Sequence, residues 1–569
     1  MLPTRDDERT GRPTAVPSAV DGAGELQRTN PAVPHEEDHT RVAEDEHDGP
    51  EPTVPGLAEE PPGDTREDDT GDHDREQEQF VPREEAARLV RAVDAVSHTE
   101  RLGRTHLNLS VPPPVRDSFV DRPPRRGMSG RTLAYRAVPD DDEHRPVYRR
   151  LLQYAFAPER GPDWDDDPHE QPAEFEPRGL YEPSSGVGDT AETDTETETP
   201  TASARPREAT DVAPGGLVVA SALVDFRMRI RGAFRPVGGV TAVASPPERR
   251  RRGHVGTLLD HMHEELRGRE VAVAALWPFS HAFYRRFDYG RTNDYVQFEF
   301  APDALDSPAA TPDEDGPFRR LAADDPADVE ALAALHERSA PEPLALDRSP
   351  DWWRHRVFRT WTGERFVYGW GDTDDQELRA YLVYGFEEDD PGRTLAVTYW
   401  GAADDEAYRQ LLTFLRNHDS QVSQVRLFAG DTSLLDRLSD PADDVTTTVK
   451  PGPMVRVVDV EAALSRLVTP ATDERVVLSV RDPRYDWNDS RFELSVDDGL
   501  TTCRRVDADG NVDVDIDIDI SALSRVLVGT RPTAVLARLG HVAGDADAVA
   551  QLDSLLPVES PAPYLREWF

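Results

Sequence analysis

The stretch from Val237 to Trp277 restricts the fold of this chain more than any other. It predicts a strand over Val237–Ser245, then an arginine-rich turn, and then a helix with one apolar face. The apolar face repeats at helical spacing and consists of Val255, Leu258, Leu259, Met262 and Leu266. The run Val271–Trp277 that follows is apolar throughout, which indicates a strand buried on both faces. A strand, an amphipathic helix and a second buried strand in succession indicate an α/β fold.

Segments of different composition predict how the rest of the chain divides into domains. At roughly 100–200 residues per domain, 569 residues predict two to four domains. We expect a disordered acidic tail over 1–78, an unassigned and partly helical region over 79–130, and α/β domains over 131–300, 315–455 and 456–569. Within the first domain an acidic, disordered insert is expected over about 161–213, where Thr alternates with Asp or Glu in places.

Periodic patterns place the other main elements. Helical spacing predicts helices near 83–96, 147–155, 326–339, 407–418 and 521–528, the last ending at Gly529. Strand patterns are found over 133–138, 216–225, 226–230, 378–386, 394–400, 475–482, 491–496 and 512–520.

The charge of the chain excludes some partners. Lys and Arg number 65 against 110 Asp and Glu, so the net charge is −45. A protein needs a basic surface to bind a phosphate backbone or an anionic membrane. We therefore expect neither nucleic acid nor a membrane as a partner. Apolar runs fall far short of the ~20 residues of a spanning helix, and the start lacks the apolar core of a signal peptide. We therefore expect a soluble, cytoplasmic protein. Its single cysteine, Cys503, can form neither an internal disulfide nor a thiolate cluster.

The kind of charge points to a habitat. Lys450 is the only lysine, so nearly every basic residue is arginine. An acidic, lysine-poor composition resembles the proteins of salt-in halophilic archaea, where molar salt screens carboxylate repulsion. The alternative is an ordinary acidic protein from a GC-rich bacterium.

The turn Glu248–Gly256 has the physical features of an anion-binding site. The first amides of a helix lack intrahelical partners and carry the positive end of the helix dipole. Gly253 lets a ligand approach the backbone closely, and Arg249–Arg252 can contact phosphate oxygens. Both nucleotide fingerprints, Gly-x-Gly-x-x-Gly and the P-loop, are missing from this turn. The alternative is that the four arginines form only a solvated basic turn.

Three segments carry a resemblance to a known family. The run Gly238–Gly253 resembles the coenzyme A segment of GNAT N-acetyltransferases. Together with Ala275–Pro278 and Phe283–Gly290 it is similar to the Eis (enhanced intracellular survival) type. That type has two GNAT-like mixed-sheet domains followed by an α/β domain like sterol carrier protein 2, and the likeness covers about 131–569. The wider GNAT signature ends in Gly or Ala where this chain has Val255.

The resemblance implies acetyl-CoA as co-substrate and no metal. It implies that pantetheine and the acetyl carbonyl are held by Val243, Ala244 and Ser245. The pyrophosphate would be held by Arg251, Arg252, Gly253, His254, Val255 and Gly256. Phe279 and Ser280 would line the thioester end. Eis-type relatives form hexamers, so a homo-oligomer is expected.

The resemblance also implies the catalytic groups of a direct transfer from acetyl-CoA to an amine. Such a transfer needs a general acid for the leaving thiolate and a general base for the amine proton. In the family the acid is a tyrosine at the position of Tyr284, and the base is the carboxylate of the last residue, here Phe569. The alternatives are that Tyr284 is a tyrosine on a helix surface and that Phe569 is only a packed end.

Other candidate sites are explained better by structure. His261 and His263 lie two apart on a helix and so face different ways, which argues against a metal site. The aspartates of 513–519 alternate with Val and Ile, which indicates the solvated face of a strand rather than a calcium loop. Trp352 and Trp353 are expected in a core or an interface, and Cys503 in a structural position.

The sequence thus predicts an acetyl-CoA-dependent N-acetyltransferase that acts on an amine of a small cationic molecule or a lysine side chain. The alternative is a non-catalytic binding or assembly protein with a GNAT fold, whose third domain binds an apolar ligand.

Overall fold

The computed structural model describes residues 133–161, 170–183, 205–306, 318–360, 363–371, 377–389, 392–471, 473–506 and 513–569. All of them belong to the unit Val81–Phe569, one of the two units into which the chain divides. The predicted acidic tail over 1–78 and the predicted helix near 83–96 lie outside these residues. Among the described helices, none is both long and apolar enough to cross a membrane.

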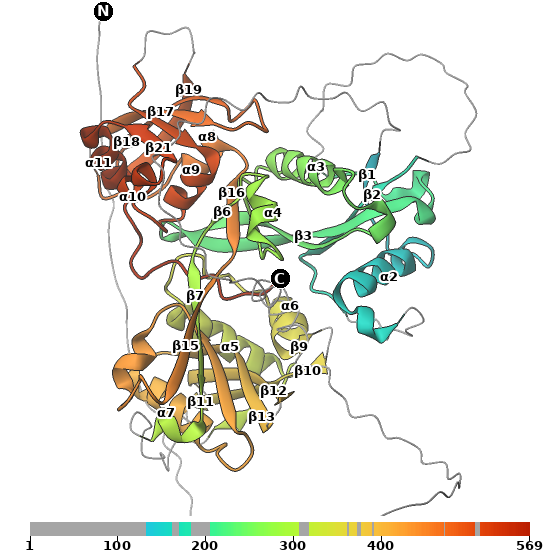
Figure 1. Cartoon of the computed structure of the whole chain (residues 1–569), viewed down its shortest axis with the longest axis vertical. Coiled ribbons are helices and arrows are strands. Elements are labelled where there is room, and N and C mark those ends of the chain that lie inside the picture. The colour runs from blue at the N-terminus through green and yellow to red at the C-terminus, as the bar shows by residue number, and fades with distance from the viewer. Residues whose placement is uncertain are drawn as a thin grey trace, which may run out of the picture. The chain divides into compact units, whose positions relative to one another are not determined.

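The first domain is built on a seven-stranded sheet (Figure 1). Its strands, in spatial order, are β1 (Ala134–Ala137), β2 (Phe175–Tyr181), β3 (Leu217–Ile230), β4 (Ala233–Ala244), β5 (Val273–Leu276), β16 (Met454–Val457) and β6 (Gly290–Arg291). Neighbours are antiparallel, except that β4 and β5 run parallel. Helices α2 (His144–Phe156) and α3 (His254–Gly268) cover opposite faces, and the short α4 (His281–Arg285) follows β5.

The expected stripe of the central helix is the buried face of α3. Leu258, Leu259, Met262 and Leu266 are all fully buried, because the helix packs its apolar side on β3 and β5. Val255 is half-buried and packs against the same cluster.

The second domain repeats this plan. Its sheet has the order β15 (Val445–Pro451), β7 (Asp294–Phe300), β14 (Gln424–Ala429), β13 (Gly392–Ala402), β12 (Leu378–Asp389), β11 (Phe366–Gly371) and β8 (Arg319–Arg320). Only β13 and β14 run parallel. Its helices are α5 (Pro326–Ser339), α6 (Pro350–Trp352), which continues as one π-helical stretch Trp353–Phe358, and α7 (Asp405–Arg416). A small hairpin joins β9 (Arg359–Thr360) and β10 (Gly363–Glu364).

The first two domains exchange strands. Strand β7 pairs with β14 and β15 in the second sheet, although it precedes the second domain in sequence. Strand β16, which follows the second domain, returns to the first sheet between β5 and β6. The expected boundaries at 300 and 456 therefore cut through this exchange. Pairing partners so distant in sequence leave no local pattern, which is why the periodicity did not reveal them.

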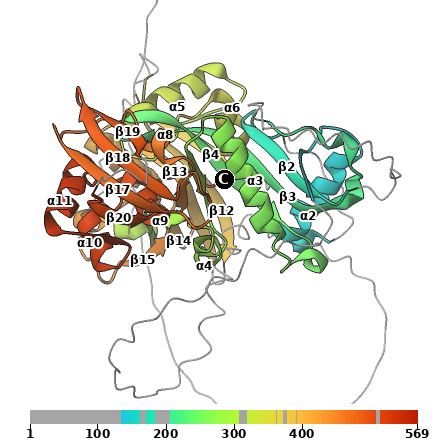
Figure 2. The same cartoon turned by 90° about the horizontal axis from the view of Figure 1, so that it is seen from above.

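The third domain is a five-stranded sheet with helices (Figure 2). The order is β19 (Leu500–Val506), β18 (Ser490–Asp497), β17 (Arg475–Arg481), β20 (Ile516–Asp519) and β21 (Val542–Gly544). Its helices are α8 (Val460–Leu464), α9 (Ile520–Leu527), α10 (Thr533–Arg538) and α11 (Ala546–Leu555). Gly529, two residues after α9, has a φ of 71°, as expected for the residue that ends a helix.

Two local expectations differ from the structure. The runs 216–225 and 226–230 form one continuous strand, β3, because Asp225 is accommodated mid-strand by an ion pair with Arg269. Strand β2 lies inside the expected insert 161–213 and pairs with β1 and β3. It contains Pro177, Gly179 and the buried Arg178, which pairs with Glu265, so it lacks an apolar alternation that would identify it. The residues 162–169 and 184–204 of the expected insert lie outside the described ranges.

Candidate functional site

Strands β4 and β5 part soon after they meet. They pair at two positions only, Gly238 with Ala274 and Gly239 with Ala275. Beyond this point β4 continues to Ala244 through a bulge, where Ala242 has a φ of 55° and the register with β3 shifts. The backbone over Val243, Ala244 and Ser245 has thus left the β5 ladder. Such a strand edge can hydrogen-bond an extended ligand between the two strands.

The turn after β4 presents the N-terminus of α3. Gly253 is the N-cap residue, with a φ of 82° and without a capping side chain. Space around it is open, so the backbone conformation, rather than crowding, requires glycine at this position. The helix that follows has fifteen residues, and its first amides are available to an anion.

The four arginines of this turn have different roles. Arg249 forms an ion pair with Glu182, and Arg250 Nε donates to Ser245 O (2.9 Å), so both brace the turn. Arg252 Nη2 donates to Glu248 O (2.9 Å) and is exposed. Arg251 is also exposed, and within the described part of the chain its guanidinium makes no hydrogen bond or ion pair. Arg250, Arg251 and Arg252 are thus all exposed, and among the described contacts of these three only the guanidinium of Arg251 is not already held by a backbone carbonyl.

His254, the first residue of α3, does not add to this positive charge near neutral pH. Partial burial lowers its pKa, and the nearby Arg252 and Arg249 lower it further. The residues predicted to hold the pyrophosphate thus form one continuous turn and helix start, and its positive charge lies on the arginines. They are Arg251, Arg252, Gly253, His254, Val255 and Gly256.

Tyr284 lies on α4, on the other side of the strand split. It is 3% exposed, so the alternative of a surface tyrosine is wrong. Its ring packs edge-on against Phe279, Phe283 and Tyr289, with centroids 5.7, 5.1 and 6.0 Å away. Burial raises the pKa of the Tyr284 phenol, which therefore stays protonated at neutral pH.

Two predicted residues define the start of α4. Ser280 is its N-cap and accepts a hydrogen bond from Phe283 N (3.3 Å). Phe279 is 59% exposed, an unusual state for a large apolar side chain next to buried rings.

Phe569 lies against the point where β4 and β5 part. A Cβ at position 239 would come within 3.1 Å of its ring, and Gly239 belongs to the last β4–β5 pair. The ring also packs edge-on against Phe226, with centroids 4.5 Å apart. Trp568 stacks on Trp277, the residue after β5, at 4.0 Å and 15°.

The second domain holds this final segment. Arg348 Nε and Glu567 Oε1 form an ion pair of 2.8 Å with exposures of 0% and 1%. Arg356 Nη2 donates to Trp568 O (3.0 Å), and Trp277 Nε1 donates to Glu567 O. Sequence reasoning missed Arg348, Arg356 and Glu567. The one available signal was a glutamate among the aromatic residues of the last segment.

The other residues considered in the sequence have the following surroundings. Within the described ranges, no group of three or more His, Cys, Asp or Glu side chains could hold a metal ion. His263 is fully buried between two tyrosines, while His261 stacks on Tyr135. Trp352 and Trp353 are core residues, as expected. A small hollow of about 90 Å³ lies near the opposite end of β5, away from the strand split.

Comparison with known proteins identifies the domains. Models of the acetyltransferase (GNAT) domain match residues 208–292 and 344–457, and a model of the sterol carrier protein domain matches 460–565. The chain is an acetyltransferase with two GNAT domains and a sterol carrier protein domain. The first match spans β3 to β6 and so includes the strand split, the arginine turn and α4 of this acetyltransferase.

Relatives of this acetyltransferase support the same architecture. An uncharacterised N-acetyltransferase of Streptomyces coelicolor is 28% identical over 297 residues, which are 50% of this chain and 70% of the relative. A probable N-acyltransferase of Enterococcus faecalis has a similar structure, with a TM-score of 0.60, 19% identity, and coverage of 77% of this chain and 100% of that one. Eis1 of Mycobacterium abscessus gives a TM-score of 0.54 and 24% identity with the same coverage. The two structures show the shared fold.

Proposed function

We propose that this chain transfers the acetyl group of acetyl-CoA directly to an amine, with the first domain as the catalytic domain. The observation that carries the proposal is the position of Phe569 beside Gly239, where β4 and β5 part. At that point the free edge of β4, the start of α3 and the helix of Tyr284 converge on one end of the sheet.

In this proposal the co-substrate follows the edge of β4. The backbone of Val243, Ala244 and Ser245 bonds the pantetheine arm and the acetyl carbonyl. The turn Arg251–Gly256 holds the pyrophosphate through helix amides and two exposed guanidinium groups. Phe279 and Ser280 line the thioester end. The bound co-substrate would then cover the ring of Phe279, which is exposed without it.

The chemistry proposed is direct attack without an acyl-enzyme. Tyr284, kept protonated by burial, donates its proton to the leaving thiolate, and the carboxylate of Phe569 accepts the proton of the amine. A cysteine nucleophile does not fit, because Cys503 lies buried in the third domain and burial raises the pKa of its thiol to about 12.

The acceptor proposed is a small cationic amine or a lysine side chain, because the chain carries a net charge of −45 that attracts cations. We further propose that this chain is an Eis-type protein and works in the cytoplasm of a haloarchaeon. Its resemblance to that type favours a homo-oligomer, specifically a hexamer.

Calorimetric titration of acetyl-CoA into the full chain at high KCl tests the proposal first. Saturable binding of one acetyl-CoA per chain is the expected result. A screen of polyamines, amino sugars and lysine peptides, read by thiol release, then tests for transfer. A folded chain that does not bind acetyl-CoA would contradict the proposal and favour the non-catalytic alternative.

A further inference from the structure

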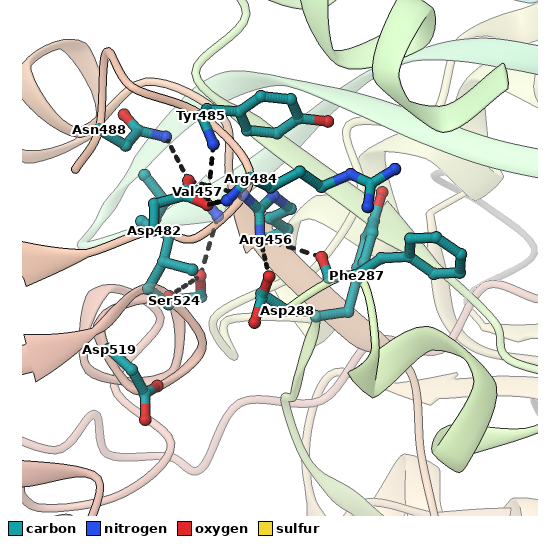
Figure 3. Close-up of polar contacts among 12 residues, drawn as sticks. Phe287, Asp288, Arg456, Val457, Asp482, Arg484, Tyr485, Asn488, Asp519 and Ser524 are labelled. Atoms are coloured by element: carbon teal, nitrogen blue, oxygen red, sulfur yellow. Dashed lines mark hydrogen bonds and ion pairs between the residues drawn. The ribbon is translucent and has the colours of Figure 1, made fainter. Parts of the chain in front are cut away.

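The loop between β17 and β18 in the third domain is held rigidly by one buried carboxylate. Asp482 accepts hydrogen bonds from Arg484 N (3.0 Å), Tyr485 N (3.3 Å) and Asn488 Nδ2 (3.0 Å). It also forms two contacts of 2.6 and 2.7 Å with Arg456 Nη2, and both side chains are 0% exposed (Figure 3). Both oxygens of this buried carboxylate accept hydrogen bonds from the loop or from Arg456, and these bonds hold the loop in one conformation.

Arg456 joins this loop to the first domain. It belongs to β16, the strand that returns to the first sheet next to β5. Its Nη1 donates to Phe287 O (2.9 Å), just after α4, as Figure 3 shows. The loop is therefore fixed relative to the helix that carries Tyr284.

Arg484 reaches the start of α3. Its Nη2 donates to Gly256 O (2.9 Å), in the first turn of the helix, and its Nε lies 2.6 Å from Asp260 Oδ1. The guanidinium also covers the ring of Phe287 at 4.8 Å. The side chain of Arg484, from the third domain, thus contacts both the first turn of α3 and the segment after α4.

Tyr485 reaches Tyr284 through two intermediates. Its hydroxyl donates to Asp260 Oδ1 (3.0 Å) and lies 2.6 Å from His263 Nδ1. His263 Nε2 lies 2.7 Å from the hydroxyl of Tyr289, whose ring packs edge-on against Tyr284. Because the proton of Tyr485 points to Asp260, the imidazole donates from Nδ1 and accepts from Tyr289 at Nε2. Burial keeps the pKa of His263 well below its usual value, so the ring is neutral, as this pattern requires.

We propose that Arg484 and Tyr485 of the third domain are positioning residues for acetyl transfer in the first domain. Arg484 fixes the first turn of α3, where the cofactor's phosphates are expected. Tyr485, acting through His263 and Tyr289, fixes the ring of Tyr284. The inference rests on the proposed function and deepens it, because it gives the sterol carrier protein domain a role in the reaction. Neither residue touches substrate, so each acts through the residues it holds.

Two conservative variants of the full chain test this proposal, because one should change mainly the Kd of acetyl-CoA and the other mainly kcat. Arg484→Gln loses the contacts with Gly256 and Asp260, so the Kd of acetyl-CoA should rise about five-fold while kcat changes less than about two-fold. Tyr485→Phe keeps the ring that stacks on Trp487 but loses both hydroxyl contacts, so kcat should fall about ten-fold with an unchanged Kd. The control is Arg504→Gln, whose side chain is 70% exposed and pairs with Glu493 on the neighbouring strand of the third domain.

Binding is measured by calorimetry and kcat by thiol release with the best amine of the screen. A purely structural role would lower the unfolding midpoint of both variants and change Kd and kcat together or leave both unchanged. Either result would overturn the inference. If the unaltered chain binds acetyl-CoA but acetylates no amine, the proposed function fails as catalysis, and the affinity of Arg484→Gln alone decides the inference. If the unaltered chain does not bind acetyl-CoA, both proposals fall.

Discussion

The two GNAT domains share a sheet plan and differ at the ends where a cofactor would bind. In the first domain α3 begins at Gly253, after a run of arginines. In the second domain α7 begins after Asp404, which caps Ala407 N (2.9 Å), and its first residues are Asp405 and Glu406. Carboxylates at a helix N-terminus stabilise the helix but repel phosphate. The same fold therefore begins this helix with arginines in the first domain, where we propose the anion site, and with carboxylates in the second.

The two domains also differ in what lies where their parallel strands separate. In the second domain β13 and β14 pair over three positions and then separate. There Trp400 Nε1 donates to Phe428 O (2.8 Å), and Arg566 Nη1 donates to Trp400 O (2.7 Å). Tyr564 packs against Gly430, just beyond β14. The chain's own final segment thus lies along the second split, and its last two residues lie where the strands of the first split part, beside Gly239 and Trp277. Sharing a fold does not make two sites equal.

Removing the proposed acid of the first domain should cause the greatest loss of activity. Tyr284→Phe should lower kcat by about 10²–10³-fold, because the leaving thiolate loses its proton donor. The Kd of acetyl-CoA should stay unchanged in calorimetry, because the phenol does not contact the phosphates. Tyr408→Phe on α7 is the matched control and should keep full activity. Equal losses in both variants would break the distinction between the domains.

A variant of Glu567 tests how the second domain holds the final segment. Glu567→Gln leaves the guanidinium of Arg348 buried without a charged partner, so the free energy of unfolding should fall by about 3 kcal/mol. Glu377→Gln removes an exposed partner of Arg338 and should cost less than about 0.5 kcal/mol. Denaturant titration at constant salt measures both. A small loss for Glu567→Gln would show that the segment is not anchored by this pair.

The two helix starts can be compared by their arginines. Arg251→Ala with Arg252→Ala should raise the Kd of acetyl-CoA about 10- to 100-fold, as expected when two phosphate contacts are lost. Arg409→Ala with Arg437→Ala near the start of α7 should leave it unchanged, because both pair with Asp405. Unchanged affinity in the first double variant would remove its arginines from the site.

The smallest effect concerns the acidic helix start. Asp404→Ala removes the cap of α7 and should cost about 1 kcal/mol of unfolding free energy at pH 7. Hydrogen bonds from Ala407 N and Arg379 lower the pKa of Asp404 despite the opposing effect of partial burial. A carboxyl with a lowered pKa stabilises the fold above its unfolded pKa, about 4, and loses this contribution as the pH falls through the folded value. The stability difference between the variant and the unaltered chain should therefore shrink in acid, and a difference independent of pH would contradict this.

Much of the first domain was predictable from local pattern. The strand, arginine turn, helix and strand of 237–277 form β4, α3 and β5, because period and cap residues act over a few neighbours. The helices near 326–339 and 407–418 correspond to α5 and α7 for the same reason. Strand β2 was missed, since its buried Arg178 is stabilised by Glu265, 87 residues away.

The site divides in the same way. The arginine turn, the helix of Tyr284 and the aromatic final segment could be predicted from the sequence, since each is a short run of consecutive residues. Three other features follow from packing alone: β7 and β16 change sheets, Arg348 pairs with Glu567 across 219 positions, and Tyr485 contacts His263 across 222. Contacts over such separations depend on how whole domains pack, and packing leaves no period in the sequence that a local pattern could reveal.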